Sequence, residues 1–287
     1  MRPTLQAETP RRDLPAGLLA WVESVCGPVE RITDLLQYHR PGSVRATLKI
    51  ETSSGATYKV RRFGHGSADE AARAARSAFN PPWMPPVIAR RDDASIEGWI
   101  HGRTLSQAPP DPTEIEHCGI LLREVHEAPS PAGAAARTPE GWAERLRDNL
   151  SQLRGAGLID AGDEAASLSR AMADRPETLT IGLVHRDLCP ENIVRDAEDR
   201  LWVVDNALLS VGAIEEDAAR VWWRWPMTAR QREAFLRGYN HSERAPWFER
   251  PNAFWRASVI ASSARIRIDA DPAGAATRAE RLLESLR

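Results

Sequence analysis

The chain has 287 residues, enough for one large domain or two small ones with a sizeable hydrophobic core. Hydrophobic residues make up 42% of the sequence and charged residues 27%, which is typical of a globular protein and excludes a disordered or fibrous one. The formal net charge of −2 argues against a nucleic-acid binder, because such proteins carry a basic surface. The cysteines, Cys26, Cys118 and Cys189, form no C-x-x-C pair, so neither a disulfide framework nor a zinc knuckle is expected.

Residues 1–15 lack the apolar run of a secretory signal. Nothing later in the chain approaches the roughly 18 apolar residues of a membrane span. We therefore expect no membrane span and a reducing, cytoplasmic location. The oligomeric state stays open.

The first hundred residues have the pattern of a small strand-rich lobe. Two runs of β-branched and aromatic residues flank a Ser-Ser-Gly turn, which predicts an antiparallel hairpin over 44–63. Strong helix formers over 67–79 end before Asn80-Pro81-Pro82 and predict a helix. A second hairpin is predicted over 86–100. This lobe should therefore contain one helix.

The remainder of the chain is mostly helical in pattern. The predicted helices cover 113–127, 140–154, 160–173, 214–224, 228–239 and 252–268, and a C-terminal piece follows. Residues 179–210 lack the helical pattern. They contain two short apolar runs that end in polar residues, which is typical of strands. We expect strand, loop, strand, hairpin turn and strand in this segment.

One segment carries a recognisable catalytic pattern. His185-Arg186-Asp187-Leu188 followed by Asn192 matches the kinase catalytic-loop pattern H-R-D-L-x-x-x-N at every position. Asp205 follows an apolar strand thirteen residues later. Phosphoryl transfer needs positioning of the reactants and neutralisation of the triphosphate by magnesium, which prefers oxygen ligands. Asn192 and Asp205 are therefore the candidate metal ligands, and Asp187 is the candidate group that orients and deprotonates the acceptor hydroxyl.

A short pattern of this kind also occurs by chance, where the histidine, aspartate and asparagine cap a turn. The strand before Asp205 and a hinge-like segment upstream favour the catalytic interpretation. Within the loop, Cys189 is better explained as a packing residue than as a nucleophile. His185 is better explained as a structural hydrogen-bonding residue than as a proton shuttle.

Together these motifs resemble the aminoglycoside phosphotransferase and choline kinase branch of the protein-kinase-like fold, over most of residues 30–240. Ile96–Leu105 is similar to the hinge of that family, which ends in a Gly-x-x-Leu turn. Leu121–His126 is similar to its Leu-Leu-x-x-x-His element.

The resemblance implies an α+β, two-lobed protein-kinase-like fold. Residues 1–98 would form a small antiparallel-sheet N-lobe with one helix that binds the nucleotide phosphates. Residues 99–287 would form a larger, mainly helical C-lobe with the catalytic loop, the metal ligands and the acceptor site.

In this family a cation on the second strand grips the α- and β-phosphates, and a helix carboxylate steadies it. Lys59 and Arg61 share one strand face because side chains alternate. Alignment with the family's strand puts Arg61 at the ion-pairing position, and Lys59 is the alternative. Glu70 is the candidate partner of the cation. Ser67-Ala-Asp-Glu70 is also a capping box, in which that carboxylate would bind its own helix end.

The Gly-rich loop G-x-G-x-x-G of protein kinases is missing from this sequence. Backbone N–H groups of Gly42 and Ser43 are the candidates for covering the phosphates. The backbone around Gly98, Trp99 and Ile100 is the candidate for binding adenine.

Further departures concern the segment after the second candidate metal ligand. Asn206-Ala207 follows Asp205, where protein kinases have Phe-Gly. Asp217 comes only twelve residues after Asp205, which leaves no activation segment for a peptide. The family implies that Asp217 buttresses the catalytic loop.

The acceptor is not identified by the sequence. Five of the ten tryptophans lie between Val221 and Trp255, and helix packing explains them better than stacking on a sugar or a cationic acceptor. The net negative charge of residues 99–287 would suit an amine-bearing acceptor.

The sequence predicts a kinase that uses ATP (GTP is the alternative) and Mg²⁺ to phosphorylate a hydroxyl of a non-peptide small molecule. Candidate acceptors are aminoglycoside-like antibiotics, which would imply antibiotic resistance, sugars, nucleosides and related metabolites. The rival of another class is a pseudokinase or nucleotide-binding scaffold without phosphotransfer. A third hypothesis is an enzyme of the same fold that transfers a nucleotide.

Overall fold

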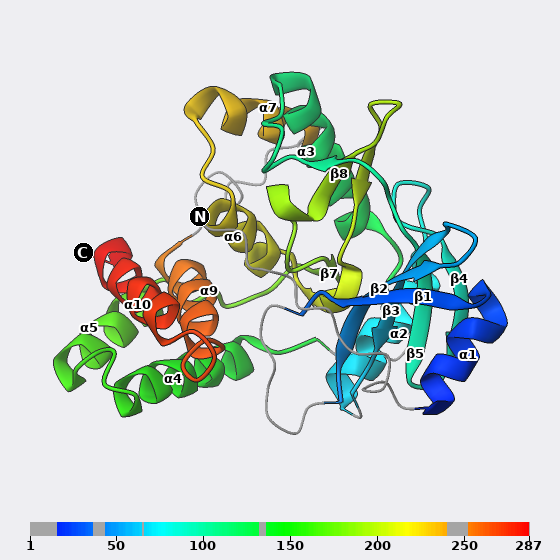
Figure 1. Cartoon of the computed structure of the whole chain (residues 1–287). Helices are drawn as coiled ribbons and strands as arrows, with labels where there is room; N and C mark the ends of the chain where they lie inside the picture. The colour runs from blue at the N-terminus through cyan, green and yellow to red at the C-terminus, as the bar shows by residue number, and fades with distance from the viewer. Residues whose placement is uncertain (1–15, 37–43, 65, 132–135, 240–251, 287) are drawn as a thin grey trace. The chain divides into compact units, whose positions relative to one another are not determined.

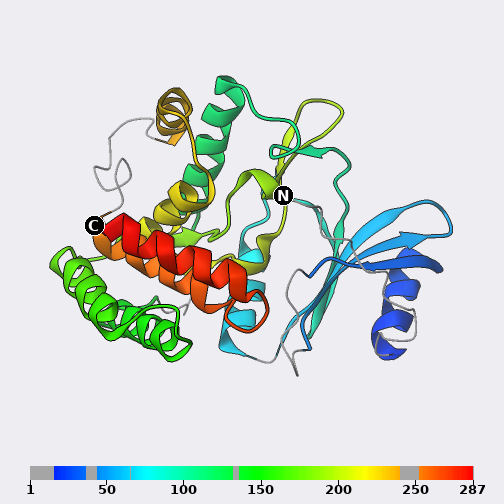
Figure 2. The same cartoon turned by 60° about the vertical axis from the view of Figure 1, so that its left-hand side comes forward.

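A computed structural model describes residues 16–36, 44–64, 66–131, 136–239 and 252–286. The chain forms two compact units, whose elements are labelled in Figure 1 and seen from a second direction in Figure 2. The first unit comprises the chain up to Glu70 together with Asn80–Gly102 and Val194–Val204. The second comprises Ala71–Phe79, Arg103–Ile193 and the chain from Asp205 onward.

The first unit is built on a five-stranded antiparallel sheet with strand order β1-β2-β3-β5-β4. Its strands are β1 (Val29–Asp34), β2 (Ala46–Thr52), β3 (Thr57–Arg62), β4 (Val87–Arg91) and β5 (Ala94–Gly98). The β2–β3 and β4–β5 hairpins confirm the two predicted hairpins. Strand β1, which pairs with β2, was not predicted.

Helix α1 (Ala16–Cys26) was also not predicted, so the expectation of one helix in the N-terminal lobe is wrong. The predicted helix is α2 (Ser67–Ala78). Leu18 and Val22 of α1 lie four residues apart on one face and are buried in the same apolar cluster as Ile96. An eleven-residue helix is marginal by itself. Packing on the sheet therefore stabilises α1. The sequence pattern of the helix itself does not show this packing, so α1 was not predicted.

The helices of the second unit agree with the predicted ones to within a few residues. They are α3 (Pro112–Glu127), α4 (Pro139–Gly155), α5 (Ala161–Ala173), α6 (Ile214–Arg224), α7 (Ala229–Tyr239), α9 (Ala253–Arg265) and α10 (Pro272–Leu286). Side-chain oxygens of Asp111, Thr138, Asp160 and Asn252 accept backbone N–H groups at the starts of α3, α4, α5 and α9. No helix within the described ranges has the length and apolar character needed to cross a bilayer.

An extensive apolar core joins α4, α5, α9 and α10. Trp142 of α4 meets Trp255 of α9 edge to face in this core, with ring centroids 5.3 Å apart. Trp222 and Trp225 both contact the ring of Phe235. The described tryptophans of the aromatic-rich stretch therefore pack helices together, as predicted.

Two glycines bring α3 and α7 into backbone contact. A Cβ atom on Gly119 would lie 2.1 Å from the carbonyl oxygen of Phe235, and one on Gly238 would lie 1.8 Å from that of Glu116. No other residue fits at either position without moving the helices apart. This close approach sets Tyr239 of α7 beside His126 of α3, with ring centroids 5.5 Å apart.

Short strands surround the predicted catalytic segment. They are β6 (Arg103–Thr104), β7 (Ile181–Val184), β8 (Ile193–Arg195), β9 (Leu201–Val203) and β10 (Ser210–Ala213). Strands β7, β8 and β9 confirm the predicted order of strand, loop, strand, hairpin and strand. Strand β10 was not predicted and pairs antiparallel with β7, which joins the chain before the loop to the chain after Asp205.

The packing of α1 can be tested by truncating a buried side chain. Leu18 is fully buried, so Leu18→Ala should lower the free energy of unfolding by about 2–5 kcal/mol through lost burial and a new cavity. Urea denaturation followed by circular dichroism measures the change. Val25 on the same helix is exposed, so Val25→Ala should change stability by less than about 0.5 kcal/mol. Equal small effects would contradict the packing of α1 on the sheet.

Candidate active site

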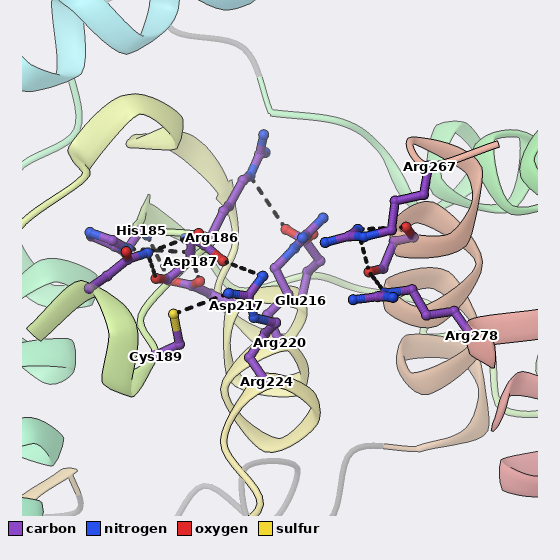
Figure 3. Close-up of polar contacts among 12 residues, drawn as sticks. His185, Arg186, Asp187, Cys189, Glu216, Asp217, Arg220, Arg224, Arg267 and Arg278 are labelled. Atoms are coloured by element: carbon purple, nitrogen blue, oxygen red, sulfur yellow. Dashed lines mark hydrogen bonds and ion pairs between the residues drawn. The ribbon is translucent and has the colours of Figure 1, made fainter. Parts of the chain in front are cut away.

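The loop after β7 is held by a buried carboxylate from α6. Asp217 is fully buried, and its two carboxylate oxygens accept the backbone N–H groups of His185 at 2.7 Å and Arg186 at 2.6 Å. Arg186 has a φ of 64°, a left-handed conformation that is uncommon for residues other than glycine. Figure 3 shows Asp217 beside these loop residues. The predicted buttressing role of Asp217 is confirmed.

A second chain of hydrogen bonds also holds Asp217. Its Oδ2 lies 3.1 Å from His126 Nε2, and His126 Nδ1 lies 2.7 Å from the Tyr239 hydroxyl. Next to a carboxylate, Nε2 is the donor, so Nδ1 accepts from Tyr239 in the neutral tautomer. The histidine of the Leu-Leu-x-x-x-His element thus supports the catalytic loop through Asp217.

The environment keeps Asp217 ionised. Burial by itself raises the pKa of this carboxyl, but the hydrogen bond from His126 and the backbone N–H of His185 outweigh burial. The net result is a pKa below the ordinary value. Asp217 therefore accepts hydrogen bonds as an anion at neutral pH.

His185 is a structural residue, in agreement with the sequence prediction. Its side chain is fully buried, Nδ1 accepts the backbone N–H of Asp187 at 3.3 Å, and Nε2 lies 3.0 Å from Asn206 Oδ1. One neutral tautomer, with the proton on Nε2, satisfies both contacts. Asn206, which differs from the protein-kinase pattern, therefore connects the segment after β9 to the catalytic loop.

Asp187 and Asn192 are bonded directly to each other. Asn192 Nδ2 donates to the backbone oxygen and to Oδ2 of Asp187, both at 2.9 Å. These two bonds orient the amide, so Oδ1 is the atom of Asn192 that remains to coordinate a cation. The structure thus brings the candidate base and one candidate metal ligand together.

Asp205 lies two residues after the end of β9, adjacent in the chain to Asn206 and with a left-handed φ of 60°. No group of three His, Cys, Asp or Glu side chains in the described part of the chain could hold a metal ion. A site built from one carboxylate and one amide fits Mg²⁺, which takes few protein ligands and completes its shell with water and phosphate oxygens. The chemistry of Asn192 and Asp205 therefore fits this ion.

Arg224, in the last turn of α6, was missed by the sequence prediction. Its Nη1 lies 3.3 Å from Asp187 Oδ1, and its Nη2 donates to Cys189 Sγ at 3.4 Å. Burial lowers the pKa of Arg224, but nearby groups, Asp187 first, raise it more, so the net pKa is above its ordinary value. Helix periodicity places Arg224 two turns after Asp217 on the same face of α6, but it does not identify Asp187 as the partner of this arginine.

Cys189 is fully buried, and burial raises the pKa of its thiol. A thiol in this environment stays protonated, which makes it a poor nucleophile. The structure thus supports the interpretation of Cys189 as a packing residue.

The central strand of the first unit carries the candidate phosphate-binding cations. Lys59 and Arg61 are 8% and 5% exposed on one face of β3, and Val60 packs into the apolar core on the other face. Glu97 of β5 lies opposite Lys59 in the strand register and is 2% exposed. Sequence alternation and the pairing of the two hairpins would together have indicated this buried carboxylate.

The first turn of α2 differs from the expected arrangement. Glu70 is exposed there, and the neighbouring Asp69 is the buried carboxylate, paired with Arg45 at 2.8 Å. Neither the pairing of Arg61 with Glu70 nor the capping role of Glu70 is established by these contacts, and both stay predictions.

The hinge-like segment begins at the end of β5. The backbone N–H of Gly98 donates to the carbonyl oxygen of Pro86 at 2.9 Å, so this N–H group is already used. The ring of Trp99 lies 5.2 Å from Lys49 Nζ in a cation–π contact. Ile100 follows after the end of the strand, in a segment without regular secondary structure. Gly42 and Ser43 lie outside the described residues.

The role of Asp217 can be tested through pH. Because its pKa is lower in the folded state, its stabilisation is complete above the ordinary value near 3.9 and is lost as pH falls through the folded-state pKa. Asp217→Asn should cost roughly 3–5 kcal/mol of unfolding free energy at pH 7. The cost should shrink below about pH 4.

Chemical denaturation across this pH range measures the difference between the wild type and the variant. Glu233→Gln, an exposed carboxylate on α7, is the matched control and should show little difference at any pH. A cost for Asp217→Asn that does not vary with pH would contradict a charged Asp217.

Comparison with known proteins agrees with this geometry. Residues 40–250 match the model of the phosphotransferase enzyme family. A homoserine kinase from Granulibacter bethesdensis is 30% identical over 166 residues, which cover 51% of this chain and 48% of that protein. The chain thus matches about half the length of this curated relative.

Solved structures of low sequence identity share the fold. A spectinomycin phosphotransferase in complex with ADP and spectinomycin superposes with a TM-score of 0.63 and 12% identity, covering 94% of this chain and 96% of that one. A choline kinase from Streptococcus pneumoniae gives a TM-score of 0.61 and 15% identity over 94% and 97% of the two chains. From the family match and these folds, the chain belongs to the phosphotransferase enzyme family and has its protein-kinase-like fold.

Proposed function

We propose that this phosphotransferase is an ATP-dependent kinase that transfers the γ-phosphate to a hydroxyl of a non-peptide small molecule. The observation that carries the proposal is the bonded pair of Asp187 and Asn192 in a loop clamped by Asp217. The ADP in the spectinomycin phosphotransferase structure supports a nucleotide as the phosphate donor. A cytoplasmic location, where ATP is available, is part of the same proposal.

In this mechanism Asp187 orients the acceptor hydroxyl and takes its proton as the oxygen attacks the γ-phosphorus of ATP, while the bond from that phosphorus to the bridging oxygen breaks and ADP leaves. Asn192 holds Oδ2 of Asp187, and Arg224 lies beside Oδ1. A carboxylate oxygen has two lone pairs, so Oδ1 can accept from the acceptor hydroxyl while Arg224 stays in place. Asn192 and Asp205 would hold Mg²⁺, which neutralises charge on the phosphates when bound.

The nucleotide-binding part of the proposal rests on the first unit. Arg61, with Lys59 as the alternative, would grip the phosphates of ATP, or of GTP. Glu97 beside Lys59 limits the charge of this cationic face. Because the Gly98 N–H is used by Pro86, Trp99 and Ile100 would supply the backbone donors for adenine.

The remaining phosphate contacts are proposed from the sequence and from the family resemblance. Gly42 and Ser43 would cover the phosphates with backbone N–H groups. Glu70 would have to turn from its exposed position to pair with Arg61.

Homoserine is the first acceptor to test, because the relative with 30% identity is a homoserine kinase. Choline and spectinomycin follow, because enzymes with those names share the fold. Spectinomycin turnover would imply a role in antibiotic resistance.

A pseudokinase is the alternative, since the Gly-rich motif is missing and Asn206-Ala207 replaces Phe-Gly. The contact between Asn206 and His185 weakens the second reason, because Asn206 has a defined part in holding the loop. Phosphotransfer therefore remains the better supported function.

Loss of the proposed base gives the first test. Asp187→Asn should lower turnover by about 10²–10⁴-fold, because the amide cannot take the proton of the hydroxyl. A coupled ADP-release assay with homoserine, choline and spectinomycin measures turnover, and calorimetry with ADP should show unchanged binding. Asp199→Asn, in an exposed turn, is the matched control. Equal rates for Asp187→Asn and the wild type would remove Asp187 from the mechanism. Mass spectrometry of the product would reveal whether the enzyme transfers a nucleotide instead of a phosphate.

The metal assignment has its own test. Asp205→Ala should abolish the strengthening of nucleotide binding by Mg²⁺, because the carboxylate ligand is gone. Calorimetry with a non-hydrolysable ATP analogue compares both proteins with Mg²⁺ and with EDTA. EDTA should weaken binding by the wild type to the level of Asp205→Ala and leave the variant unchanged. Identical Mg²⁺ dependence in both proteins would contradict the assignment.

A further inference from the structure

A cavity of about 230 Å³ lies in the helical unit, lined by side chains of α4, α9 and the segment just before α4. Three of its lining residues are Arg137, Arg145 and Arg265, and the side chain of Asn149 lines it as well. The carboxylates of Glu144 and Asp148 lie on its exposed side. The cavity is therefore polar and rich in guanidinium groups.

The three guanidinium groups lack direct anionic partners. None of them forms an ion pair within 4 Å with a carboxylate of the described residues. Burial, followed by the charge of Arg137, lowers the pKa of Arg145 to about 10, and burial followed by the charge of Arg186 lowers that of Arg137. Glu216 and Glu144 oppose these shifts only in part. The arginines remain cationic at neutral pH, and an added anion would stabilise them.

Two residues that line the cavity carry hydrogen-bonding groups without a partner among the described residues. Asn149 is 3% exposed, and its side chain forms no hydrogen bond with another residue that the structure describes. The Nε atom of Arg265 is buried without a hydrogen-bond partner among those residues. Buried polar groups are rarely left unpaired. A ligand with acceptor oxygens in the cavity would accept hydrogen bonds from the Asn149 amide, which lines it.

The cations are held in position by an aromatic ring. The guanidinium carbons of Arg137 and Arg145 lie 5.2 Å and 6.0 Å from the ring centroid of Trp142. Trp142 is itself 5% exposed and packed against Trp255. Because the ring is fixed in the core, both arginines are prepared for a ligand at little cost in side-chain entropy.

The cavity is linked electrostatically to the catalytic loop within the same unit. Glu216, a buried residue of α6, acts on both Arg137 and Arg145. The same carboxylate pairs with Arg186 of the catalytic loop at 3.4 Å and with Arg220. Figure 3 shows Glu216 between Arg186 and Arg220, next to Asp217.

We propose that this cavity binds an anionic group, a carboxylate or a phosphate, of the acceptor. The proposal rests on the proposed kinase function and names the class of acceptor. It differs from the expectation based on the net charge of residues 99–287, because the charges that line the cavity are mainly basic although the lobe is acidic. An amine without an acidic group would not satisfy these arginines.

Binding of inorganic phosphate tests the cavity without any need for turnover. Calorimetry should show phosphate binding by the wild type and at least about tenfold weaker binding by Arg145→Gln and Arg265→Gln, a loss expected when a charged hydrogen-bond donor is removed. Arg147→Gln on α4 and Arg256→Gln on α9 remove exposed arginines from the same helices and should bind like the wild type. Arg145→Lys keeps the charge and should retain part of the binding. Equal affinity in all variants, or no binding by the wild type, would overturn the proposal.

Turnover then tests the role of the anion in the acceptor. L-homoserine carries a carboxylate, and its carboxamide is the matched neutral acceptor. The wild type should favour homoserine, and Arg145→Gln should raise the KM for homoserine while the KM for ATP and the carboxamide kinetics stay the same. An unchanged preference for homoserine in Arg145→Gln would overturn the acceptor assignment.

The two experiments separate failure of this proposal from failure of the proposed function. Phosphate binding that depends on Arg145, together with turnover that is the same in Asp187→Asn, would refute the kinase mechanism and retain the anion site. The opposite result would retain the mechanism and refute the anion site. In that case turnover depends on Asp187, but phosphate binding is the same in Arg145→Gln and the wild type.

Discussion

One buried carboxylate holds the candidate active site together. Asp217 fixes two successive backbone N–H groups of the catalytic loop, and His126, which is itself bonded to Tyr239, holds the carboxylate. A buried charge is costly unless it is well paired, so the loop, α3, α6 and α7 must keep these positions together. The backbone contact of α3 with α7 at two glycines serves the same arrangement. The direction of Asp187 therefore depends on packing far from it in the sequence.

Acidic and basic side chains alternate near the candidate active site. The net charge of the chain does not reveal this local arrangement. Asp187 lies beside Arg224, and buried Glu216 separates Arg186 and Arg220 in the loop and α6. Arginines line the cavity beyond them. Asp187 and Glu216 each lie beside an opposite charge, whereas guanidinium groups outnumber carboxylates in the cavity. Under the proposal of an anion site, local pairing and not net charge would select the acceptor.

Sequence reasoning predicted the features that are local in the chain and missed those that depend on distant contacts. The loop from His185 to Asn192 is contiguous, so its pattern sufficed, and the two hairpins and most helices follow from periodicity and capping residues. Helix α1 was missed because packing on the sheet stabilises it. The contact between Arg224 and Asp187 spans 37 positions, and that between Asp217 and His126 spans 91. No local pattern encodes which of many arginines meets a given carboxylate.

The most direct measurement is a crystal structure with Mn²⁺ in place of Mg²⁺ and a non-hydrolysable ATP analogue, in which anomalous scattering locates the metal. We expect Mn²⁺ to be bound by Asn192 Oδ1, the Asp205 carboxylate and phosphate oxygens, with Asp187 pointing to the γ-phosphate and outside the metal's coordination shell. A metal bound elsewhere, or a nucleotide whose γ-phosphate lies away from Asp187, would contradict the proposed mechanism.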